Sequence, residues 1–184
     1  LAASSSLDEA TALLGAMNHR APLTVRANRL KGDRDRLAER LRREDVASRP
    51  TALAEDGLVL DTRRNVYELA AFREGWMELQ DEGSQLVAEL VAPPPRSAVV
   101  DACAGAGGKT LALGALMRSQ GRLYALDVDP KRLARLKPRL ARSGLSNVQP
   151  EEIAHERDSR VKRLAGKADR VLVDAPCTGT GTLR

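Results

Sequence analysis

The stretch Ala98-Val99-Val100-Asp101-Ala102-Cys103-Ala104-Gly105-Ala106-Gly107-Gly108-Lys109-Thr110 predicts a strand that ends in an acid, followed by a glycine-rich turn that opens a helix. The strand is expected at residues 98–101 and the helix at residues 107–117. Glycines let the backbone come close to a ligand, and a helix N-terminus offers free N–H groups. The turn is therefore a candidate ligand site.

The residues that follow alternate between further strands and helices. Strands are expected at residues 122–127, 147–153 and 170–174, and helices at residues 130–143 and 159–165. A helix at residues 81–91 precedes the first strand and is ended by Pro93-Pro94-Pro95. Alternation at these lengths implies βαβ units and a parallel sheet, so the predicted fold class is α/β.

The last of these strands belongs to the segment Arg170-Val171-Leu172-Val173-Asp174-Ala175-Pro176-Cys177-Thr178-Gly179-Thr180-Gly181. Its three consecutive apolar residues suit a parallel strand buried on both faces. Ligands bind outside the carboxyl ends of strands in open α/β sheets, so Asp174 and Cys177 fall where chemistry takes place. For an isolated motif of this kind, a buried aspartate that caps a turn beside an inert thiol is the simpler interpretation. The glycine-rich strand end upstream is what favours a site.

The first part of the chain has a different pattern. A helix is expected at residues 7–17 with Ser6 as N-cap and Glu9 three residues on, and a charged helix at residues 33–43. Strands are expected at residues 23–28, 57–61 and 76–80. This part is predicted to be a small α+β unit, whose exposed arginines could follow a phosphate backbone or simply keep the unit soluble.

Composition limits the classes of partner. The chain has 184 residues, with 30 Lys and Arg against 25 Asp and Glu, and a formal net charge of +5. This excess favours a polyanion such as nucleic acid, although a solvated arginine-rich surface has the same composition. Four aromatic residues are too few for a base-stacking platform. Cys103 and Cys177 match neither a metal site nor a disulfide framework, so no metal and a reduced, cytoplasmic setting are expected, and no run is long enough for a membrane span.

Three kinds of site compete for the glycine-rich turn. A P-loop requires a glycine where Cys103 stands, so that interpretation fails. A dinucleotide motif that starts at Gly105 requires a glycine where Thr110 stands, which weakens it. Asp127 ends the next strand 22 residues after Gly105, where an acid can accept hydrogen bonds from ribose hydroxyls. A nucleoside cofactor without pyrophosphate, such as S-adenosylmethionine, is therefore favoured; Asp158 could contact its adenine amino group, or equally serve as a helix N-cap.

At this point the motifs carry a family resemblance. Residues 101–110 resemble the D-x-C-A-x-x-G-G-K-T motif, and residues 174–181 the D-A-P-C-S-G-x-G motif, of the RsmB/Nop/Sun family of RNA cytosine-5 methyltransferases. Residues 80–85 are similar to its Q-D-x-x-S stretch, and residues 22–28 to its P-x-x-x-R-x-N strand. There are two departures. Ala106 replaces a common proline, and the family's second catalytic cysteine has no counterpart before Arg184.

The resemblance implies a Rossmann-like class I methyltransferase domain at residues 80–184, incomplete at its C-terminus after four strands. The small α+β domain at residues 1–79 would precede it and could bind RNA. The implied activity is methyl transfer from S-adenosylmethionine to C5 of a cytosine in ribosomal or transfer RNA. Cys177 would help to release the product, and the nucleophilic cysteine would lie beyond Arg184, so the fragment alone is expected to be inactive. The expected cofactor-binding residues are Cys103, Ala104, Gly105, Ala106, Gly107, Gly108, Lys109, Asp127, Asp158 and Asp174. The alternatives are a catalytically silent RNA-binding module that retains the fold and, less favoured, a nicotinamide-dependent oxidoreductase.

Overall fold

The computed structural model describes residues 6–17, 21–61 and 64–176. Residues Leu23–Ala175 form the larger compact unit of the chain, and helix α1 (Leu7–Met17) lies outside it. The N-terminus of α1 has the expected capping box. The backbone N–H of Glu9 donates to Ser6 Oγ at 3.2 Å, and that of Ser6 donates to Glu9 Oε2 at 2.9 Å.

The first sheet of the larger unit is antiparallel, with strand order β2-β3-β1-β4. Its strands are β1 (Leu23–Ala27), β2 (Ala47–Pro50), β3 (Gly57–Asp61) and β4 (Met77–Leu79). Helix α2 (Arg34–Arg43), the 3-10 helix η1 (Val66–Glu68) and helix α3 (Ala70–Arg73) complete it. Leu37 and Leu41 of α2 share a buried core with Leu58 and Met77. The small α+β unit is thus confirmed, with β2, η1 and α3 as elements that the sequence did not predict.

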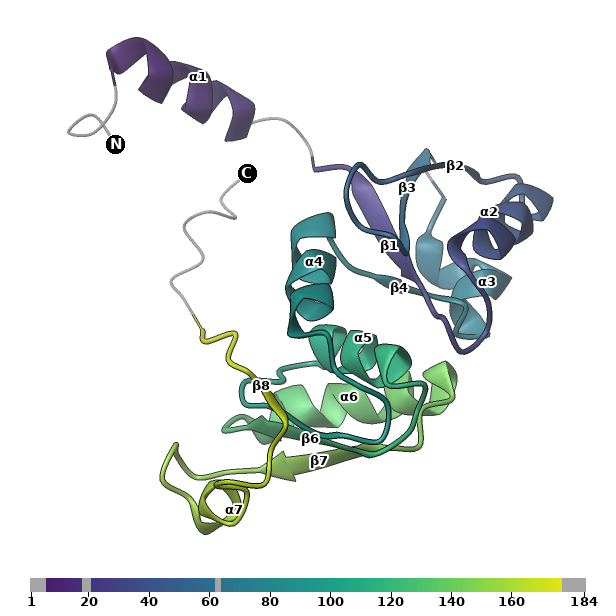
Figure 1. The fold of residues 1–184 in the computed structure, drawn as a ribbon. Helices are drawn as coiled ribbons and strands as arrows, with labels where there is room; N and C mark the ends of the chain where they lie inside the picture. Colours follow the sequence, from purple (N-terminus) through teal and green to yellow (C-terminus); the bar gives the residue numbers. More distant parts are fainter. Residues whose placement is uncertain (1–5, 18–20, 62–63, 177–184) are drawn as a thin grey trace. The chain divides into compact units, whose positions relative to one another are not determined.

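The second sheet is parallel throughout, with strand order β7-β6-β5-β8 (Figure 1). Its strands are β5 (Ala98–Asp101), β6 (Arg122–Asp127), β7 (Val148–Glu152) and β8 (Arg170–Leu172). Its helices are α4 (Glu82–Val91), α5 (Gly108–Leu116), α6 (Pro130–Ser143) and α7 (Ser159–Lys162). The predicted α/β class and parallel sheet are confirmed.

Alternation along the strands places helices on both faces of this sheet. Val99 packs with Leu113 of α5, and Ala125 packs with Leu136 of α6. Val100 faces the other way, into a cluster against which Val161 of α7 packs. Helices α4, α5 and α6 therefore cover one face of the sheet, and α7 covers the other.

Strand β8 corrects one expectation. The sequence predicted a strand at residues 170–174 with residues 171–173 buried on both faces, but the strand ends at Leu172, and only Leu172 is buried, at 7% exposure. Val171 and Val173 are 56% and 65% exposed. The physical reason is position: within the described residues β8 pairs with β5 alone, at the end of the sheet.

Two features are absent from the described residues. None of the helices there is both long and apolar enough to cross a bilayer. No group of three His, Cys, Asp or Glu side chains in the same residues is arranged to hold a metal ion.

Candidate cofactor-binding site

The glycine-rich turn lies between β5 and α5 and has two left-handed glycines. Gly105 has φ +55° and Gly107 has φ +87°, and the N–H of Gly107 donates to the Ala104 carbonyl at 2.9 Å. A Cβ on Gly107 would lie 2.2 Å from Leu136 Cδ1, whereas a Cβ on Gly105 would meet nothing within 4 Å. Gly107 thus lets α6 pack closely, and Gly105 leaves open space beside the backbone.

The N-terminus of α5 offers backbone N–H groups as hydrogen-bond donors. Gly107 is its N-cap and provides no side-chain hydrogen bond. The N–H groups of the first helical turn have no intrahelical acceptor, so they are available to a ligand. Lys109 adds a full positive charge to this end of the helix, and its Nζ lies 2.6 Å from Asp174 Oδ2. The predicted meeting of the glycine-rich turn with the end of β8 is therefore present in the structure.

Asp127 lies against the turn, at the end of β6. Its Oδ2 accepts a hydrogen bond from the Gly105 N–H at 2.7 Å, and its Oδ1 accepts one from the Asp129 N–H at 2.8 Å. The side chain is buried. Each carboxylate oxygen has a second lone pair, so Asp127 can still accept hydrogen bonds from ligand hydroxyls.

Asp158 is the N-cap of α7. Its Oδ2 accepts from the Ala154 N–H at 2.9 Å and its Oδ1 from the Arg160 N–H at 2.8 Å. These backbone hydrogen bonds, that of Ala154 foremost, lower the pKa of the Asp158 carboxyl. The helix-cap interpretation of Asp158 is thus confirmed, and a contact with an adenine amino group stays a prediction.

A pocket of about 240 Å³ opens beside the turn. The sequence had placed Cys103, Ala104, Gly108, Lys109 and Asp174 in the site, and all of them line this pocket. The other lining residues are Leu79, Gln80, Asp81, Ser84, Asp101 and Arg139. Gln80, Asp81 and Ser84 could have been predicted as pocket residues, because they belong to the family-like stretch at residues 80–85. No motif of the sequence points to Arg139.

Burial raises the pKa of two groups in the pocket. Asp101 accepts a hydrogen bond from Thr110 Oγ1 at 2.7 Å, and burial raises the pKa of its carboxyl to about 6. Burial also raises the pKa of the Cys103 thiol, with the carboxylates of Asp127 and Asp101 acting in the same direction. A raised pKa keeps Cys103 in the thiol form, which suits a packed residue of the turn better than a nucleophile.

The remaining predicted site residues are Ala106 and Cys177. The Ala106 carbonyl accepts a hydrogen bond from Arg139 Nη1 at 2.6 Å. Cys177 lies outside the described residues.

The arrangement fits a nucleoside cofactor with a charged amino-acid tail. Free helix N–H groups and Lys109 suit a carboxylate, the Asp127 oxygens suit hydroxyls, and the open side of Gly105 leaves room for the ligand between them. None of these groups points to a pyrophosphate in the ligand.

Comparisons with known proteins agree with the fold. A sequence model of the family described as 16S rRNA methyltransferase RsmB/F matches residues 88–184. A second one, for the ferredoxin-like domain of RsmF/B-like methyltransferases, matches residues 4–67. The sheet order β2-β3-β1-β4, with helices after β1 and β3, is that of a ferredoxin-like domain.

Individual relatives are longer than this chain. Ribosomal RNA small subunit methyltransferase B of Pseudomonas syringae is 36% identical over 94% of the chain, which spans 38% of that protein. A probable enzyme of the same name from Bacillus subtilis is 33% identical over 88% of the chain and 36% of its own length.

Solved structures show the same fold. A methyltransferase homologue from Pyrococcus horikoshii is 32% identical with a TM-score of 0.82, covering 91% of this chain and 54% of its own. NSun6 of the same organism, solved with SFG, has a TM-score of 0.84 at 18% identity, covering 94% of this chain and 67% of its own, and this likeness supports the fold alone.

Proposed function

The chain belongs to the RsmB/F family of 16S rRNA methyltransferases, and from this premise we propose that the protein transfers a methyl group from S-adenosylmethionine to C5 of a cytosine in ribosomal RNA of the small subunit. The observation that carries the proposal is the match over residues 88–184, which includes the glycine-rich turn, Asp127 and Asp174. Relatives that carry the name ribosomal RNA small subunit methyltransferase B favour ribosomal over transfer RNA as the substrate.

The cofactor would be held by residues on both sides of the turn. Asp127 would accept hydrogen bonds from the ribose hydroxyls, and Asp158 would contact the adenine amino group. The N–H groups of α5 and Lys109 would bind the amino-acid tail, with Cys103, Ala104, Gly105, Ala106, Gly107 and Gly108 forming the backbone wall. When bound, S-adenosylmethionine supplies an electrophilic methyl group on a sulfonium sulfur.

The chemistry explains why two cysteines would be needed. Cytosine C5 is a poor nucleophile until a thiolate adds to C6 and makes C5 electron-rich. C5 would then take the methyl group supplied by the cofactor, which would be left as a neutral thioether. A base removes the C5 proton, and the bond between C6 and the thiolate sulfur breaks. By resemblance, the attacking cysteine lies beyond Arg184, Cys177 helps to release the product, and Asp174 contacts the cofactor and could also reach the cytosine.

The small α+β unit would contribute RNA contacts. We place it at residues 1–79 and the cofactor-binding domain at residues 80–184. The exposed arginines of this unit suit a phosphate backbone, and the chain as a whole has a net charge of +5. A reduced cytoplasmic setting, where ribosomal RNA is modified, is the corresponding proposal for localisation.

The test is incorporation of tritiated methyl groups from S-adenosylmethionine into unmodified 16S rRNA by the protein at its natural length. We expect one modified position, read out as 5-methylcytosine by mass spectrometry of RNA fragments. Residues 1–184 alone should bind cofactor without transferring methyl groups. RNA binding without any incorporation would favour the catalytically silent module. Tighter binding of NADH than of S-adenosylmethionine in calorimetry would favour the oxidoreductase.

A further inference from the structure

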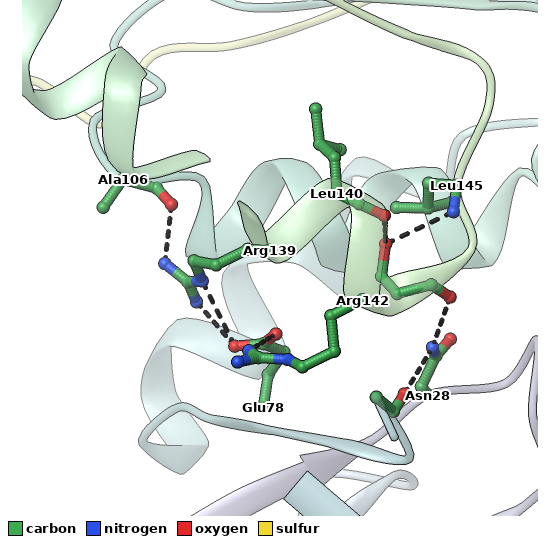
Figure 2. Close-up of polar contacts among 9 residues, drawn as sticks. Asn28, Glu78, Ala106, Arg139, Leu140, Arg142 and Leu145 are labelled. Atoms are coloured by element: carbon green, nitrogen blue, oxygen red, sulfur yellow. Dashed lines mark hydrogen bonds and ion pairs between the residues drawn. The ribbon is translucent and has the colours of Figure 1, made fainter. Parts of the chain in front are cut away.

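Arg139 of α6 contacts two separate parts of the chain at once (Figure 2). Its Nε and Nη2 donate to Glu78 Oε2 of β4 at 3.2 Å and 2.9 Å. Its Nη1 donates to the Ala106 carbonyl at 2.6 Å. One guanidinium thus joins the first sheet to the turn between β5 and α5.

The geometry of this bridge depends on the planar fork of arginine. Two of its nitrogens are fixed by the Glu78 carboxylate, so the direction of the third is set. The Glu78 side chain is only 7% exposed and that of Arg139 is 20% exposed, so water competes weakly for these hydrogen bonds. A lysine has a single ammonium and cannot hold both acceptors in this way.

Further contacts hold α6 against the first sheet. Arg142, one turn along α6, pairs with Glu78 Oε1 through its Nη2, and its guanidinium lies 3.8 Å from the centre of the Phe72 ring. Asn28, just after β1, donates to the carbonyls of Gly75 at 2.8 Å and Ser143 at 2.9 Å (Figure 2). The position of Arg139 is therefore fixed by packing on both sides.

We propose that Arg139 is a positioning residue for the cofactor turn: Glu78 orients its guanidinium, and the guanidinium holds the Ala106 carbonyl in place. Ala106 lies between the two left-handed glycines, Gly105 and Gly107, where the backbone is least restricted. A hydrogen bond from a charged donor at this point fixes the turn that would contact the cofactor. The proposal deepens the function proposed above and rests on it.

Arg142 provides a matched control. It lies on the same helix, pairs with the same carboxylate and has a side-chain exposure of 19%, close to that of Arg139. No hydrogen bond joins it to the turn among the described residues. A difference between the two arginines therefore isolates the contact with Ala106 from the ion pair with Glu78.

The experiment compares Arg139→Lys and Arg142→Lys in the protein at its natural length. We expect Arg139→Lys to raise the KM for S-adenosylmethionine about tenfold, the effect of losing one hydrogen bond to a charged group, with kcat changed less than twofold. Arg142→Lys should leave that KM within twofold, and both variants should lower the Tm to a similar extent. Each variant is assayed well below its own transition.

Equal effects of the two variants on the cofactor KM would overturn the proposal, since Arg139 would then act only through packing. Calorimetry of S-adenosylmethionine binding separates this result from failure of the proposed function. If the wild-type protein bound cofactor but methylated no RNA, the proposed reaction would be wrong, while a tenfold weaker binding by Arg139→Lys alone would still support the role of Arg139.

Discussion

The Asp127 carboxylate accepts a hydrogen bond from the Gly105 N–H at 2.7 Å, so the end of β6 is joined directly to the glycine-rich turn. The same carboxylate accepts from the Asp129 N–H at 2.8 Å. Asp127 thus has a structural task in holding the turn, besides the ribose contact that we propose. Removing its side chain should affect the turn and the ligand together.

Asp127→Ala should weaken S-adenosylmethionine binding by more than tenfold, because ribose hydroxyls lose their acceptors and the Gly105 N–H loses its partner. Asp127→Asn keeps one carbonyl oxygen and the size of the side chain, so its affinity should fall between those of the wild type and the alanine variant. Titration calorimetry gives both values. Unchanged affinity in Asp127→Ala would remove Asp127 from the site.

Asp101 should make stability depend on pH in a narrow window. Burial raises the pKa of its carboxyl to about 6 in the folded protein. In the unfolded chain an aspartate carboxyl has a pKa of about 4. Between these values the folded state binds more protons than the unfolded state, so the free energy of unfolding falls as the pH rises and levels off above pH 6. The loss is about 3 kcal/mol, at roughly 1.4 kcal/mol per pKa unit.

Asp101→Asn lacks this titration and can still accept the hydrogen bond from Thr110. Urea titrations of both proteins at several pH values between 3.5 and 7.5 test the point, since the other carboxyls titrate in both and cancel. The difference in unfolding free energy should change between about pH 4 and pH 6 and stay constant above. A difference that does not vary with pH would show that Asp101 titrates normally.

Glu78→Gln should destabilise the fold by about 3–5 kcal/mol, because it leaves the buried Arg26 and the partly buried Arg139 and Arg142 without their counter-charge. Arg139 and Arg142 both pair with Glu78, and burial lowers the pKa of nearby Arg26 to about 10 even with Glu78 present. Glu39→Gln is the control: it breaks an exposed ion pair with Arg43 and should cost less than about 0.5 kcal/mol. The free energy of unfolding of both variants is measured by urea denaturation. If it fell equally in both, the ion pairs of Glu78 would contribute no more than an exposed pair.

The sequence predicted the parts of the site that depend on local pattern. The spacing of 22 residues between Gly105 and Asp127 places both at the ends of neighbouring strands, and adjacent parallel strands bring their carboxyl ends together. The two residues are indeed joined by a hydrogen bond. Strand β2 was missed because Ala47-Ser48-Arg49-Pro50 has no apolar alternation and ends in proline, as edge strands can. Arg139 could not be found, because its contacts lie 33 and 61 residues away in sequence and arise only from the packing of α6.

Cys177→Ala, made in the protein at its natural length, should let methylation begin but slow the release of product. The resemblance assigns the attack on C6 to a cysteine beyond Arg184, so the covalent bond to RNA would still form in this variant. Without Cys177 the final breakage of the bond between C6 and sulfur would be impaired, and the adduct would accumulate. Denaturing gels with labelled RNA would then show a retarded band that is absent from the wild type and from Cys103→Ala, whose thiol has a raised pKa and packs in the turn. Normal turnover without a band would make Cys177 structural. A variant that forms no adduct and transfers no methyl group would instead make Cys177 the nucleophile, and the assignment of roles to the two cysteines would have to be reversed.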